Sequence, residues 1–173
     1  MNLKFRMKHL PETDFVKLIE QHKAIVYKIS NLYAQTTEDR KDLFQEIIIS
    51  LWRAYPGFKG NSKISTWIYK IGLNTAITNY RKGMNKVKYE SIYEFPPEAL
   101  GDDTNNEQKD NINILYQAIE GLNKIDKAII ILYLDERSYK EISEIIGITA
   151  ANTGMKIKRI KERLAEKIVQ NKQ

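Results

Sequence analysis

The sequence predicts an all-α protein of two small helical domains joined by a flexible linker, the C-terminal one a helix-turn-helix. Apolar residues recur every three or four positions in both halves, and no stretch alternates long enough to demand a strand. A stretch rich in proline and acidic residues separates the halves. A short capped helix, a glycine and a longer basic helix follow in the C-terminal half. We expect domains at residues 1–82 and 109–173 and a linker at 83–108.

Three helices are expected in the N-terminal half. The first carries apolar residues at helical spacing over residues 15–32, and the second over residues 43–52. Thr36 followed by Asp39 predicts a capping box at the start of the second helix, and Pro56-Gly57 predicts its end. The third helix is expected over residues 62–82. Its expected apolar side consists of Ile64, Trp67, Ile68, Ile71 and Ile77.

Four helices are expected in the C-terminal half. Apolar spacing predicts the first two over residues 112–122 and 125–133. Ser138 and Glu141 predict a capping box for the third, and Gly147 predicts its end in a left-handed conformation. Thr149 can cap the fourth helix, whose apolar face is formed by Ile157, Ile160, Leu164 and Ile168.

Composition excludes several functions. The 173 residues contain no cysteine and two histidines, which removes disulfides, thiolate metal sites and a cysteine nucleophile. No metal site and no cofactor are expected. We find no membrane-spanning run and no signal-peptide core, so the chain is predicted to be cytoplasmic. The chain is also predicted not to be an enzyme and to have no small-molecule substrate.

The distribution of charge indicates an anionic partner. Residues 1–82 carry 14 basic against 7 acidic side chains, residues 83–111 carry 3 against 7, and residues 112–173 carry 11 against 8. Two basic segments therefore flank an acidic one, which favours two domains that face nucleic acid. Solvated helix faces would explain the same charges equally well.

The last predicted helix has the character of a recognition helix. Between residues 149 and 161 it carries four cations and no acidic residue, and polar side chains precede these cations near its start. In a helix-turn-helix, the N-terminal residues of the second helix enter the major groove, and lysine and arginine bind phosphates. A helical hairpin with a solvated basic face is the alternative.

These motifs resemble a bacterial RNA polymerase sigma factor of the extracytoplasmic-function (ECF) type. The helix-turn-helix is similar to region 4, which reads the −35 promoter element. Asp42-Leu-Phe-Gln-Glu-Ile-Ile-Ile-Ser-Leu-Trp-Arg53 is similar to region 2.2, and the segment over residues 58–82 is similar to regions 2.3 and 2.4. The resemblance implies core RNA polymerase (its β′ clamp and β flap), promoter DNA and an anti-sigma factor as partners.

The resemblance, together with the residue types, selects three sets of candidate residues. Asn74 and Asn79, which both belong to the candidate −10 contacts given below, are expected to face the same general side. The candidate −35 contacts are Lys140, Thr149, Asn152, Thr153, Lys156, Lys158, Arg159 and Lys161. The candidate −10 contacts are Lys59, Asn61, Lys63, Trp67, Lys70, Asn74, Asn79, Arg81 and Lys82. The candidate core-binding residues are Asp42, Gln45, Glu46, Trp52 and Arg53.

Two other functions stay open at this point. A stand-alone helix-turn-helix regulator would share the C-terminal motif alone, but it would need a dimer interface or a sensing domain. A helical enzyme acting on nucleic acid would need paired carboxylates. Asp102-Asp103 and Glu38-Asp39 are such pairs, but neither has histidine support. Departures from the family pattern, among them Thr78, Thr153 and Lys156, leave the bases that are read undetermined.

Overall fold

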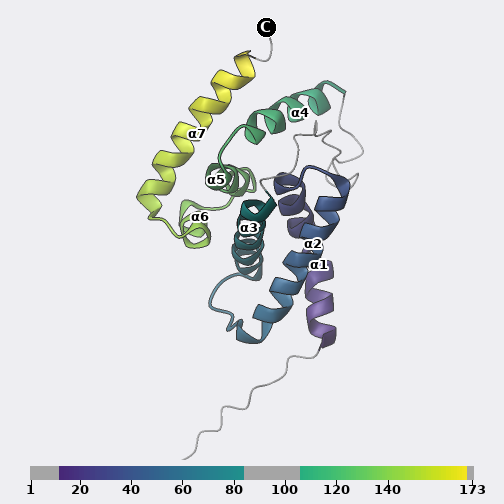
Figure 1. The fold of residues 1–173 in the computed structure, drawn as a ribbon. Coiled ribbons are helices and arrows are strands. Elements are labelled where there is room, and N and C mark those ends of the chain that lie inside the picture. The colour runs from purple at the N-terminus through teal and green to yellow at the C-terminus, as the bar shows by residue number, and fades with distance from the viewer. Residues whose placement is uncertain (1–11, 84–105, 171–173) are drawn as a thin grey trace, which may run out of the picture. The chain divides into compact units, whose positions relative to one another are not determined.

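The computed structural model describes residues 12–83 and 106–170. These residues are helical, with no strand in the described ranges, and they fall into two compact units within residues 1–87 and 88–173 (Figure 1). The predicted all-α class is confirmed. Most of the predicted linker lies outside the described residues, and the helix α4 begins at Asn106, before the predicted domain start at residue 109.

The N-terminal unit is a bundle of three helices that all pack on one another. They are α1 (Glu12–Tyr33), α2 (Thr37–Ala54) and α3 (Ile64–Gly83), and the short 3₁₀ turn η1 (Tyr55–Gly57) follows α2. Thr36 caps α2, because its hydroxyl oxygen accepts a hydrogen bond from the backbone N–H of Asp39 at 3.0 Å. Pro56 forces the change to 3₁₀ geometry, since its ring excludes a further α-helical hydrogen bond.

The core of this unit is a stripe from each helix. Val26, Ile29 and Leu32 of α1 meet Leu43, Ile47 and Leu51 of α2. On α3 the buried stripe runs through Ile68, Tyr69, Leu73 and Ala76, whereas four of the expected residues, Ile64, Trp67, Ile71 and Ile77, are only half-buried. The sequence pattern placed this stripe slightly off, because Gly72 and Ala76 carry too little side chain to reveal a close helix–helix approach.

The C-terminal unit consists of α4 (Asn106–Glu120), α5 (Lys124–Leu134), α6 (Tyr139–Ile146) and α7 (Ala150–Gln170). Helix α5 is buried nearly all round, from Ala128 to Leu132, and α7 packs against α4, α5 and α6. In Figure 1, α6 and α7 are the yellow-green pair joined by a tight turn.

The predicted signals around α6 are confirmed in detail. Ser138 and Glu141 form a complete capping box, with the Ser138 N–H donating to the Glu141 carboxylate at 3.0 Å. Gly147 ends α6 with φ of 80°, where a left-handed residue without a side chain is unstrained. Thr149 then caps α7 by accepting from the Asn152 N–H at 3.2 Å.

Candidate nucleic-acid interface

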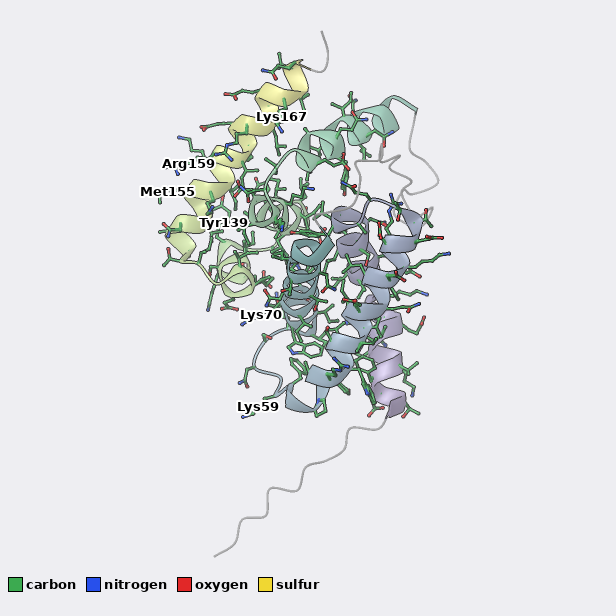
Figure 2. The ribbon with its side chains drawn as sticks, viewed as in Figure 1. Lys59, Lys70, Tyr139, Met155, Arg159 and Lys167 are labelled. Atoms are coloured by element: carbon green, nitrogen blue, oxygen red, sulfur yellow. The ribbon has the colours of Figure 1, made fainter. Side chains whose placement is uncertain are left out.

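The N-terminal part of α7, up to about residue 162, presents an outer face that the rest of the unit leaves uncovered. Thr153, Ile157, Ile160 and Leu164 are buried and point into the unit. A helix turns about 100° per residue, so the side chains opposite this buried stripe are Ala151, Met155 and Glu162, with Lys158 on one flank and Arg159 on the other. All five are exposed. Figure 2 places Met155 and Arg159 on this outer side of α7.

Thr153 is a correction to the candidate −35 contacts. Its side chain is 0% exposed, and its hydroxyl donates to the backbone carbonyl of Thr149 at 3.0 Å. A threonine that bonds back to its own helix and faces the core offers nothing to a base edge. Thr153 lies four residues before Ile157 and seven before Ile160, so the apolar spacing of this helix already indicates its inward side.

Lys156 and Lys161 are turned toward their own unit. The Lys156 ammonium lies 3.4 Å from the carboxylate of Asp126, which is 5% exposed, and the Arg163 guanidinium lies 3.2 Å from the other oxygen of that carboxylate. The Lys161 ammonium lies over the ring of Tyr133, 5.4 Å from its centroid. These two lysines therefore have intramolecular partners, which the sequence pattern did not indicate.

Lys161 is nevertheless exposed, and the remaining −35 candidates are accessible as well. Lys140 on α6, and Asn152, Lys158 and Arg159 on α7, are all exposed. Thr149 is exposed as well, although its hydroxyl oxygen is already used as the cap of α7. Met155 was missed by the sequence reasoning, although its position 200° from Thr153 on a helical wheel would have indicated its outward orientation.

A second basic surface lies on the N-terminal unit. Lys63, Lys70 and Asn74 are seven and four residues apart, so they share one face of α3 and the turn before it, and all three are exposed. Lys59 and Asn61 are exposed in the loop that precedes α3 (Figure 2). The side chains of Arg81 and Lys82 lie outside the described residues.

Trp67 is half-buried in an aromatic cluster. Its ring centroid lies 5.0 Å from that of Phe58 and 6.4 Å from that of Tyr55. Phe58 and Tyr55 both lie just before the loop over residues 59–63, so this cluster anchors the start of that loop. Trp67 therefore has a packing role, and its partly exposed edge remains on the same face as Lys63 and Lys70.

Asn79 does not share a face with Asn74, contrary to expectation. Its side-chain amide donates a hydrogen bond to the carboxylate of Glu46 on α2. The two asparagines are five residues apart, so their side chains diverge by about 140° around α3. Asn79, a candidate −10 contact, and Glu46, a candidate core-binding residue, are therefore direct partners in this structure.

The outer face of α2 combines acidic, polar and apolar side chains. Asp42, Gln45, Glu46 and Arg53 are exposed, and Trp52 is 43% exposed. Beside them a shallow cavity of about 270 Å³ is lined by Phe15 and Val16 of α1 and by Ile48, Ile49 and Trp52 of α2. The Phe15 and Trp52 rings pack edge to face at 5.0 Å. The contribution of α1 to this surface was not predicted.

In the described ranges, no three histidine, aspartate or glutamate side chains gather so as to hold a metal ion. None of the helices in the same ranges is long and apolar enough to cross a membrane. The pKa shifts concern other residues: burial raises the pKa of Tyr33, and burial aided by Asp135 raises that of Tyr116.

Comparison with known proteins agrees with this arrangement. The family model for Sigma-70 region 2 matches residues 18–85, and the model for Sigma-70 region 4 matches residues 112–164. The chain is 26% identical to the ECF RNA polymerase sigma factor SigW of Bacillus subtilis over 184 residues, or 97% of each chain. It is 45% identical to the ECF sigma factor SigG of Mycobacterium tuberculosis over 40 residues, which span 23% of this chain but only 11% of SigG.

A solved structure has the same fold. The sigma factor RpoE of Bartonella quintana, crystallised in complex with the anti-sigma factor NepR, matches with a TM-score of 0.71. The match covers 90% of this chain and 96% of RpoE at 19% sequence identity.

The chain has two helical units, and the second is a helix-turn-helix. Together with the matches to both sigma regions, these units define the class of protein as a transcription initiation factor. A stand-alone regulator related by the C-terminal motif alone is not favoured, because the N-terminal unit matches region 2. The chain belongs to the sigma-70 family of RNA polymerase sigma factors, and within that family to the ECF type.

Proposed function

We propose that this protein binds core RNA polymerase and directs it to promoters by recognising a −35 and a −10 element. The observation that carries this proposal is the outer face of α7, where the cations Lys158 and Arg159 flank the start of a recognition helix. The protein contributes no chemistry of its own in this role and works in the cytoplasm, beside the polymerase.

The outer face of α2 is the proposed core-binding surface. Exposed Asp42, Gln45 and Glu46 can pair with a basic partner helix, and the β′ clamp is the partner that the family implies. Trp52 supplies the exposed aromatic side chain that commonly anchors an interface. The adjoining apolar cavity with Phe15 and Val16 extends this surface onto α1.

The face of α3 with Lys63, Lys70 and Asn74, together with the loop over residues 59–63, is the proposed −10 surface. Cations along one face can follow a phosphate backbone, and the partly exposed Trp67 offers an aromatic edge beside them. Taking a base out of the stack costs a few kcal/mol, which contacts to the displaced strand would offset.

An anti-sigma factor is the proposed regulator. RpoE of Bartonella quintana, which has the same fold, was crystallised with such a partner. In this chain the apolar cavity between α1 and α2 is open, and a regulator that covered it would compete directly with core polymerase.

Run-off transcription tests the proposal. Core polymerase supplemented with this protein should initiate at promoters of the source genome at which core enzyme alone is silent. The double variant Lys158→Glu/Arg159→Glu should still co-purify with core polymerase and should lose specific initiation, because it places two negative charges against phosphates.

The variant Lys158→Arg/Arg159→Lys serves as the matched control. It keeps both charges on exposed positions and should retain binding to promoter DNA within a few-fold. If the wild-type protein neither binds core polymerase nor supports initiation at any promoter, the proposed function is wrong. If the charge-reversed protein initiates normally, α7 is not the promoter-reading element.

A further inference from the structure

The centre of the outer face of α7 is apolar. Met155 is 55% exposed and stands opposite the buried stripe, with exposed Ala151 one turn before it. Neither side chain has a polar atom that could form a strong hydrogen bond to a base or a phosphate. If the second turn of α7 faces DNA, the favourable partner of Met155 there is an apolar group.

Two neighbouring residues, Gly154 and Tyr139, extend this apolar surface. Gly154 precedes Met155, although glycine inside a helix costs about 1 kcal/mol relative to alanine. The ring of Tyr139, from the first turn of α6, lies beside it, and a Cβ on Gly154 would meet that ring at 3.4 Å. Tyr139 is itself 46% exposed. The ring of Tyr139, Gly154, Met155 and Ala151 together form what we call the apolar plate.

Two exposed cations flank the apolar plate, and their positions suit a surface that faces DNA. Lys158 and Arg159 follow it by one turn and lie on the two flanks of Met155, where they can hold phosphates on both sides of a groove. Exposed Glu162 lies on the same outer line two turns after Met155 and would repel phosphates. The part of α7 that can enter the groove is thus limited to about residues 150–159.

The major groove offers one apolar group, the C5 methyl of thymine, and alkyl side chains pack on it. We propose that Met155, supported by Ala151, reads a thymine methyl in the −35 element and is a determinant of promoter specificity. This inference rests on the proposed function, because it requires that α7 enters the major groove.

The test replaces single thymines by deoxyuridine, which removes only the methyl group. Promoters are first selected by wild-type holoenzyme from a library randomised at the −35 position. Each thymine of the selected element is then replaced in turn, and promoter binding by the holoenzyme is measured. At one position or two adjacent positions, deoxyuridine should weaken binding about fourfold, the value for one buried methyl group.

A double-mutant cycle ties this loss to Met155. Met155→Ala should weaken binding to the thymine promoter by a similar factor or more, and deoxyuridine should then cause no further loss. Met155→Leu keeps an alkyl side chain and should preserve the discrimination. Val169→Ala, which truncates another exposed apolar residue of α7, is the matched control and should behave as wild type.

The outcomes separate the two hypotheses. If deoxyuridine has no effect at any selected thymine, if no thymine is selected, or if the effect persists in Met155→Ala, the inference is overturned. If the wild-type holoenzyme binds no promoter of the library at all, the proposed function itself fails, and the inference fails with it.

Discussion

Asp126 lies in the first turn of α5 and meets three donating side chains. Its carboxylate accepts from the Asn123 amide at 2.7 Å, from Lys156 at 3.4 Å and from Arg163 at 3.2 Å. Asn123 is also the N-cap of α5, accepting from the backbone N–H groups of Ile125 and Asp126. One buried carboxylate thus links the start of α5 to two turns of α7.

Removing this carboxylate should loosen both helices. We expect Asp126→Ala to lower the free energy of unfolding of the C-terminal unit by about 1–3 kcal/mol, because buried hydrogen bonds to a charged group are lost. The half-exposed cations limit the cost, since they regain water. Hydrogen exchange of the α5 and α7 amides measures the change.

Glu144→Ala is the control for that experiment. Glu144 is an exposed acid on α6, and its loss should change stability by less than about 0.5 kcal/mol. Equal protection of α5 and α7 in the two variants would show that Asp126 does not hold the helices together.

At the scale of the helices, α1 and α2 both approach α3 closely at Gly72. A Cβ built there would lie 2.7 Å from the Cδ1 methyl of Ile29 on α1 and 3.5 Å from a methyl of Ile47 on α2. Ile29 is fully buried, so it has little room to withdraw. Glycine at this position sets how tightly the three helices pack.

Gly72→Ala should therefore be destabilising despite the better helix propensity of alanine. Overpacking costs about 1–3 kcal/mol, and a contact of 2.7 Å to a buried side chain belongs in the upper part of that range, above the gain of about 1 kcal/mol from propensity. Trp52 and Trp67 are the two tryptophans of the chain and both lie in this unit, so urea denaturation followed by their fluorescence reports it.

Ile29→Val is the matched background, because it removes the Cδ1 methyl that a Cβ at residue 72 would strike. In that background Gly72→Ala should be neutral or stabilising, which is a coupling that independent sites would not show. If the alanine costs the same in both backgrounds, contact with Ile29 is not the reason for the glycine.

Helix positions were predictable from local signals, whereas helix faces were less so. Ser138, Glu141 and Gly147 act within a few residues of themselves, so spacing in the sequence sufficed to place α6. Thr153 is a polar residue on the apolar side of α7, and its complete burial depends on the packing of α7 against three other helices. A binding residue has to lie on the accessible face of its helix. Because helix faces were less predictable than helix positions, the candidate sites were less predictable than the fold.

Among the described residues, each unit has one tyrosine whose pKa is raised by burial. They are Tyr33 at the end of α1 and Tyr116 in α4, and for Tyr116 the nearby Asp135 adds to the effect. An ordinary tyrosine ionises at about pH 10. The neutral form is therefore favoured by folding in both units.

Both units should lose stability above about pH 10. The unfolded chain releases the tyrosine proton there, while the folded unit keeps it until the pH passes the raised pKa. For each tyrosine the free energy of unfolding falls by up to about 1.4 kcal/mol per pH unit over that window. Urea denaturation between pH 9 and 11, followed by tryptophan fluorescence, measures this slope for the N-terminal unit.

Tyr33→Phe should reduce the fall of the free energy of unfolding with pH in the N-terminal unit. The same slope in the C-terminal unit, measured by hydrogen exchange, should stay unchanged. The alkaline slopes of the two proteins are compared rather than their stabilities at neutral pH, because loss of the Tyr33 hydroxyl can by itself change the stability at neutral pH. An unchanged alkaline slope in Tyr33→Phe would mean that another group titrates.

Contacts between charged and polar side chains from distant parts of the chain account for what the sequence could not supply. Lys156 and Asp126 are 30 residues apart, and Asn79 and Glu46 are 33 residues apart. Composition and spacing identify such residues as polar and helical, but only the packed bundle determines which of them meet.

The intramolecular partners of Lys156 and Lys161 affect how the proposed DNA binding should respond to salt. Each cation that neutralises a phosphate releases about 0.9 counterion from duplex DNA. If both lysines keep Asp126 and the Tyr133 ring as partners when the proposed DNA complex forms, the slope of log affinity against log salt should be shallower by about two than with both lysines on phosphates. Less of the affinity of this unit then comes from charge, and more must come from the fit of its surface to a particular sequence.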